Sequence, residues 1–117
     1  MAIDYTERSV TPDTVVLELK GRLTAGNRLS DVEYAAKKII GAGNKKLVVD
    51  ISGVEYLDSA ALGMLVAVTG EIAENGGLAY VAGPTPRVSE IFRICQVQVV
   101  LNIKDTLETA LSDFGAA

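Results

Sequence analysis

The chain has 117 residues, of which 49% are hydrophobic, and its formal net charge is −4. This length allows one domain with one modest core, and the hydrophobic content is that of a folded protein. We therefore expect a single domain over residues 1–117. The mild acidity argues against direct nucleic-acid binding, because neutralising phosphates requires a basic face.

The missing residue types exclude several kinds of chemistry. The chain has no histidine, so neither a Ser-His-Asp system nor a His-ligated metal site can be built. Cys95 is the only cysteine, which excludes an internal disulfide and a cysteine-based zinc site. We therefore expect a protein that is not an enzyme, with no catalytic residues, no metal and no cofactor.

The chain start indicates no targeting segment. Asp4, Glu7 and Arg8 interrupt the first ten residues, which contain no apolar core of a signal peptide. The longest nearly apolar stretch, residues 60–68, is much shorter than the roughly 20 residues that span a membrane. We expect a cytoplasmic protein without membrane insertion.

Strands and helices are predicted to alternate along the chain, from β-branched apolar runs and from helical spacing of apolar residues respectively. The expected elements are, in chain order, strands at residues 3–9 and 15–19, a helix from Asn27 with Leu29, Val32, Ala36 and Ile39 inward, a strand at 47–51, a helix after Asp58 with Leu62, Leu65, Val66, Thr69, Ile72 and Ala73 inward, a strand at 78–82, a helix lined by Val88, Ile91, Phe92 and Cys95, a strand at 97–103 and a helix at 106–114.

This order predicts an α/β fold with a mixed central sheet of about five strands, mostly parallel, and about four helices. In such sheets the working surface lies where strands lead into helices. Those places are residues 21–28, 52–61 and 83–87.

Three acids, Asp50, Glu55 and Asp58, lie near one end of the predicted sheet. Acids so placed could pair for acid–base chemistry or hold magnesium, but no histidine or fixed base accompanies them. We interpret Asp50 and Glu55 as solvated loop or strand-end residues and Asp58 as a helix cap. Cys95 lies on the apolar face of its helix and is predicted to be a small buried residue.

The segment Tyr56-Leu57-Asp58-Ser59-Ala60-Ala61-Leu62-Gly63 stands out. Either Asp58 or Ser59 can cap the following helix, but one cap is sufficient. Capping also leaves Gly63 unexplained, since glycine inside a helix is about 1 kcal/mol less favourable than alanine. Small residues would let another molecule approach the helix start closely. An exposed Ser59 hydroxyl at that position is a candidate for phosphorylation.

Residues 47–63 resemble the signature strand, loop and helix start of the STAS domains, and residues 16–23 are similar to the family's second strand. Residues 75–77 and 86–88 also match in order. The resemblance implies a STAS-type fold and an anti-sigma factor antagonist (anti-anti-sigma factor). Such a protein regulates transcription by partner switching. It binds an anti-sigma factor, which is also a serine kinase, and is released when that kinase phosphorylates the residue matching Ser59.

The same resemblance implies a set of partner-binding residues, which comprises Thr24, Asp58, Ser59, Ala60, Ala61 and Gly63. Thr24 stands where the family often has Asp, and Arg22 replaces a common Glu, so we expect a less negative loop and a changed choice of partner. Two alternatives remain: a STAS subunit of another assembly, with a transporter ATPase or in a stress-signalling particle, and a small α/β enzyme. The oligomeric state is left open.

Overall fold

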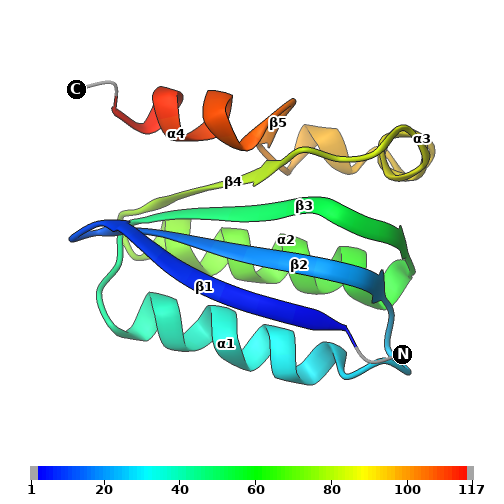
Figure 1. Ribbon diagram of the computed structural model, residues 1–117, viewed down its shortest axis with the longest axis horizontal. Helices are drawn as coiled ribbons and strands as arrows, with labels where there is room; N and C mark the ends of the chain where they lie inside the picture. Colours follow the sequence, from blue (N-terminus) through cyan, green and yellow to red (C-terminus); the bar gives the residue numbers. More distant parts are fainter. Residues whose placement is uncertain (1–2, 116–117) are drawn as a thin grey trace.

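The computed structural model describes residues 3–115, which form one five-stranded sheet with helices on both faces (Figure 1). The elements are β1 (Asp4–Thr11), β2 (Thr14–Leu23), α1 (Leu29–Gly41), β3 (Lys46–Leu57), α2 (Ser59–Glu74), β4 (Leu78–Ala82), α3 (Pro86–Cys95), the 3-10 helix η1 (Val97–Val99), β5 (Ile103–Lys104) and α4 (Leu107–Gly115). The strands follow one another across the sheet in chain order. β1 runs antiparallel to β2, and all other neighbours are parallel. The predicted fold class is confirmed.

Two cores lie on opposite faces of the sheet, because successive residues of a strand point to opposite sides. The larger core lies against α1 and α2 and includes Leu47 and Val49 of β3. The smaller core lies against α4 and includes Val48. There the ring of Tyr80 stacks on that of Phe114, with 4.4 Å between centroids. Figure 1 shows α1 and α2 on one side of the sheet and α4 on the other. No helix within residues 3–115 is long and apolar enough to cross a membrane.

β3 is longer than predicted and is bulged. Ile51, Val54 and Leu57 are all buried although they are three residues apart, which a regular strand with its two-residue period does not allow. Two register shifts against β2 each place one extra residue on β3. Each extra residue turns the following side chains back toward the core. Glu55 therefore lies within a strand and not in a loop, and the bulged strand ends directly before Asp58.

The strand predicted at residues 97–103 is wrong for most of its length. Gln96 adopts a left-handed conformation (φ 58°) and ends α3, and the chain then turns into η1. The carbonyl of Val97 accepts hydrogen bonds from the N–H groups of Val100 (3.0 Å) and Leu101 (2.8 Å). Only the two residues of β5 pair with β4. One buried side chain, Leu101, anchors this segment, so it need not extend as a strand.

Three side chains lie in other surroundings than predicted. Cys95 is exposed, because it lies in the last turn of α3, beyond the buried Val88 and Phe92. Ala73 is also exposed, since it falls outside the buried stripe of α2. Asp50 is only 4% exposed, not solvated, because β3 is covered on both faces. The carboxylate of Asp50 accepts a hydrogen bond from the Ser52 N–H at 3.0 Å.

Candidate partner-binding site

Of the two residues that could cap α2 according to the sequence, Asp58 is the cap. It has an extended conformation (φ −103°, ψ −178°), and its Oδ1 accepts a hydrogen bond from the Ala61 N–H at 2.9 Å. Its Oδ2 accepts a second bond from the Ala25 N–H at 3.0 Å. The N–H of Asp58 donates to the carbonyl of Leu23 at 3.3 Å. One side chain therefore fixes the start of α2 to the loop between β2 and α1.

These bonds keep the Asp58 carboxylate charged. The hydrogen bond from the Ala25 N–H, followed by that from Ala61, lowers the pKa of Asp58 below its ordinary value, while desolvation opposes the shift. A carboxylate that accepts backbone N–H bonds is stabilised in its ionised form. A negative charge therefore lies at the positive end of the α2 dipole.

Ser59 is the first residue of α2, and its side chain is exposed. Because Asp58 caps the helix, Ser59 is not needed for that role. Within residues 3–115 the Ser59 hydroxyl takes part in no hydrogen bond, whereas both carboxylate oxygens of Asp58 do. The hydroxyl is free to react with or contact another molecule.

The small residues after Ser59 divide into exposed and buried positions. Ala60 and Gly63 are exposed, and a Cβ added at Gly63 would meet no atom within 4 Å. Nothing inside the described structure therefore requires glycine at this position. Ala61 is 0% exposed and packs in the larger core. We correct the predicted set of contacts here, because the Ala61 side chain cannot reach a partner.

The loop that contains Thr24 lies beside the start of α2. Thr24 is half-buried, and its carbonyl accepts the Asn27 N–H at 3.0 Å. The side-chain amide of Asn27 donates to the carbonyl of Arg22 at 2.7 Å, which closes the loop on itself. The bond between Ala25 and Asp58 then joins this loop to α2. Two of the three predicted working regions are thus brought together.

The third region, residues 83–87, starts α3. Thr85 caps this helix, with its hydroxyl oxygen accepting the Val88 N–H at 3.2 Å. The guanidinium carbon of Arg87 lies 5.4 Å from the centroid of the Tyr56 ring, two residues before Asp58 in the sequence. All three regions therefore meet around the end of β3.

The three acids singled out in the sequence do not form a joint site. Asp58 is occupied as a cap, and Glu55 is exposed on β3. Asp50 instead lines a separate hollow of about 330 Å³ with Asp105 and Thr106. Within residues 3–115, no group of three or more Cys, Asp or Glu side chains could hold a metal ion.

Sequence reasoning missed Ala25 and the convergence of Arg22 and Arg87 on Tyr56. Ala25 contributes only its main-chain N–H, which any residue except proline could supply. No side-chain pattern could have found it. The arginines come from β2 and α3, elements far apart in the sequence, and only the fold brings them together.

The fold and this site define a small α/β domain with an exposed serine at a capped helix start, and residues 3–115 contain no cluster of side chains that could hold a metal ion. The chain belongs to the STAS domain family, whose model matches residues 5–110.

Known relatives agree with this assignment. A protein of Thermotoga neapolitana, provisionally named an anti-sigma factor antagonist, is 25% identical over 104 residues, which cover 89% of this chain and 92% of the relative. The solved anti-sigma factor antagonist SpoIIAA in its unphosphorylated form has a TM-score of 0.82 at 19% identity, covering 97% of this chain and 98% of the other. The phosphorylated form of SpoIIAA from Bacillus has a TM-score of 0.73 at 18% identity, covering 96% and 100%.

The two solved structures are similar in fold. The family match shows that this chain is a STAS domain, and the relatives to which it is similar are named anti-sigma factor antagonists. These are regulatory proteins and not enzymes.

Proposed function

We propose that this protein is an anti-sigma factor antagonist that works by partner switching. Unphosphorylated, it binds an anti-sigma factor that is also a serine kinase; phosphorylated on Ser59, it is released. The observation that carries this proposal is the exposed Ser59 hydroxyl, free of internal hydrogen bonds within residues 3–115 while its neighbour Asp58 caps the helix. The existence of a relative solved in a phosphorylated form supports it.

The physical effect of the modification differs between the free protein and the complex. A phosphoryl group adds about −1.5 to −2 charge. In the free protein the N-terminus of α2 offsets this with roughly 0.3–1 kcal/mol, and the exposed group stays hydrated. In a closed interface the group loses water beside the ionised Asp58. A loss of about 1.4 kcal/mol weakens binding tenfold, so the complex separates while the fold persists.

The proposed contact surface consists of Thr24, Asp58, Ser59, Ala60 and Gly63. Thr24 and Asp58 belong to one rigid unit, because Asp58 holds the loop through Ala25. Ala60 and Gly63 present little side chain on the exposed side of α2, which lets a partner come close to the helix backbone. Asp58 acts mainly by holding the surface in shape, since both its oxygens are already hydrogen-bonded.

Mass spectrometry tests the modification directly. The protein is incubated with ATP and the anti-sigma factor that co-purifies with it from the native cell, and its intact mass is measured. We expect one added phosphoryl group on the wild type and none on Ser59→Ala. Phosphate on Thr24 or Thr85 would contradict the assignment.

The co-purification also tests the class of partner. Recovery of an anti-sigma factor with kinase activity is the expected result. Recovery of a transporter ATPase or of a large stress-signalling particle would contradict the proposal and assign the domain to another assembly.

A further inference from the structure

Two arginines from different elements converge on one aromatic ring beside the proposed contact surface. The guanidinium carbon of Arg22, near the end of β2, lies 4.7 Å from the centroid of Tyr56, and that of Arg87 in α3 lies 5.4 Å from it. The two guanidinium carbons are therefore within about 10 Å of each other. Both arginines are exposed and the ring is half-buried. We call these three residues the Arg22–Tyr56–Arg87 patch.

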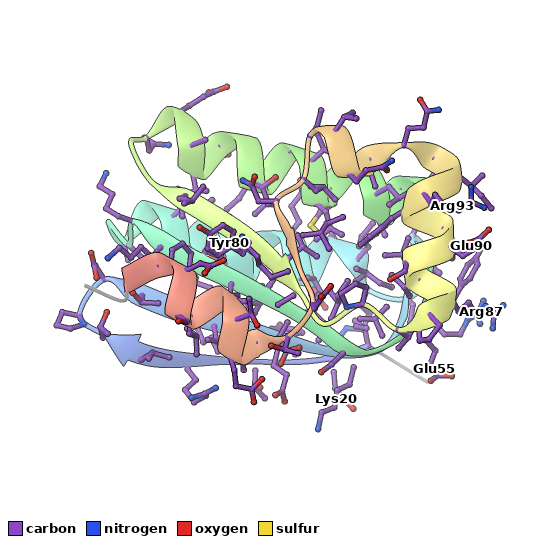
Figure 2. The ribbon with its side chains drawn as sticks, turned by 90° about the horizontal axis from the view of Figure 1, so that it is seen from above. Lys20, Glu55, Tyr80, Arg87, Glu90 and Arg93 are labelled. Carbon is purple, nitrogen blue, oxygen red and sulfur yellow. The ribbon has the colours of Figure 1, made fainter. Side chains whose placement is uncertain are left out.

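The positive charge of this patch is not neutralised inside the described structure. Arg28 forms an ion pair with Asp31, and Arg93 forms one with Glu90. Within residues 3–115, neither Arg22 nor Arg87 has a carboxylate within 4.0 Å. Figure 2 shows Glu55 and Arg87 at the same end of the molecule, but they form no such pair. The chain as a whole has a net charge of −4, but the two neighbouring guanidinium groups are both positive and repel each other. An incoming anion would relieve that repulsion.

We propose that the Arg22–Tyr56–Arg87 patch binds acidic side chains of the protein that docks on the Ser59 surface. That the docking protein is an anti-sigma factor rests on the function proposed above. The patch adjoins this surface through the backbone: Arg22 precedes Leu23, whose carbonyl accepts the Asp58 N–H, and Tyr56 comes two residues before Asp58.

The composition of the patch suits a carboxylate-bearing protein. A guanidinium offers a planar set of N–H donors that matches both oxygens of a carboxylate. Tyrosine and arginine are among the residues that contribute most to protein–protein affinity, because they combine a large flat area with polar groups. Both arginines are exposed, so each guanidinium remains open to an acidic side chain. Such charges also speed association at low salt.

A titration with a defined acidic peptide tests the patch without any anti-sigma factor. The full-length protein, labelled with ¹⁵N, is titrated with tetraglutamate peptide at about 20–50 mM salt, where exposed charges are weakly screened. We expect shifts of the Arg22, Tyr56 and Arg87 signals that fade at high salt. Arg22→Glu and Arg87→Glu should each weaken peptide binding about fivefold or more.

Arg8→Glu is the matched control, because it makes the same charge change on exposed β1. Arg8 pairs with Val16, six residues before Arg22 along β2, or about 20 Å away. An effect of Arg8→Glu equal to that of Arg22→Glu would overturn the proposal, as net charge alone would then explain binding. Tighter binding of inorganic phosphate or ATP than of the peptide would overturn it in favour of a phosphate site. A dimer in sedimentation experiments that Arg22→Glu dissociates would assign the patch to self-association.

The second arm uses the co-purified partner. The association rate should fall about tenfold in Arg22→Glu and depend steeply on salt in the wild type, whereas an unchanged rate would overturn the proposal. The two proposals fail separately. Ser59→Ala removes the phosphorylation site but should leave peptide binding intact. If the wild type does not bind the peptide, only the proposal for the patch is contradicted. If the wild type is not phosphorylated, only the proposed switch is contradicted.

Discussion

Asp58 connects three parts of the site through one carboxylate and one N–H. Its oxygens accept bonds from Ala61 in α2 and Ala25 in the preceding loop, and its N–H donates to Leu23 at the end of β2. The position of the exposed Ser59 is therefore fixed partly by groups outside α2. A change at Asp58 should disturb the position of the loop as well as the helix start.

The hydrogen bonds to Asp58 make its contribution to stability depend on pH. Its pKa is lower in the folded protein than the ordinary value of 3.8. The stabilisation is therefore fully present above that value and is lost as the pH falls through the folded-state pKa. Asp58→Ala should lower the free energy of unfolding by about 0.5–2 kcal/mol at neutral pH, and the difference from wild type should shrink in acid.

Urea denaturation at neutral pH and at a series of pH values below 3.8 measures this difference. Ser59→Ala serves as the control, because its hydroxyl makes no internal bond within residues 3–115 and its removal should leave the pH dependence unchanged. A gap between Asp58→Ala and wild type that stays constant with pH would contradict the assigned role of the charge.

The sequence left open whether Asp58 or Ser59 caps α2, and this choice could not be made from local pattern. Both residue types are good caps. The Oδ2 of Asp58 accepts a hydrogen bond from the Ala25 N–H, 33 residues away in the sequence. This bond favours Asp58 over Ser59 as the cap, and it exists only in the folded chain. The same is true of Ala61, whose burial depends on how α2 lies against the sheet and not on its small size.

At the scale of elements, α2 contains two exposed glycines that its own packing does not explain. A Cβ at Gly63 or at Gly70 would meet no atom within 4 Å, so alanine fits at both positions. Gly63→Ala and Gly70→Ala should each raise the free energy of unfolding by about 1 kcal/mol. Thermal or urea melts of the two variants check this, and destabilisation by either would contradict the open space around them.

Partner binding should separate these two variants. Gly63 lies one turn from Ser59, whereas Gly70 lies about three turns along α2, at about 1.5 Å per residue. A methyl group at Gly63 should obstruct close approach and weaken binding of the co-purified anti-sigma factor, while Gly70→Ala should bind as the wild type. Equal affinities of both variants would place the interface away from the start of α2.

The segment Gln96-Val97-Gln98-Val99-Val100 shows where element prediction from sequence fails. Its alternation and β-branched residues are typical of a strand. In the structure the chain turns into η1, and Val99 and Val100 remain 79% and 59% exposed. Only Ile103 and Lys104 pair with β4, so tertiary pairing and not strand propensity decides where the strand lies. The bulges of β3 were hidden for a similar reason, since they appear only in the register against β2.

At the scale of the whole molecule, the sequence predicted the architecture well. The alternation of strands with helices is enough to give a mostly parallel sheet, and the turn residues Thr11, Pro12 and Asp13 between the first two predicted strands are compatible with the antiparallel pairing of β1 and β2. What the sequence could not give is the side-by-side placement of the three strand–helix connections around Tyr56 and Asp58. That placement depends on strand order and register, which the residue pattern leaves undetermined.

One negative charge at Ser59 should weaken partner binding strongly while the fold persists. Ser59→Asp puts an acid at a helix N-terminus, which is favourable or neutral for folding, but an unpaired charge buried against a partner costs several kcal/mol. The most direct measurement is calorimetry of Ser59→Asp against the anti-sigma factor, with thermal melts of each protein alone and Ser59→Ala as the neutral control. We expect affinity reduced well beyond tenfold for Ser59→Asp, wild-type affinity for Ser59→Ala, and nearly unchanged melting temperatures. Equal affinity of wild type and Ser59→Asp would contradict this expectation and indicate a constitutive subunit that binds elsewhere.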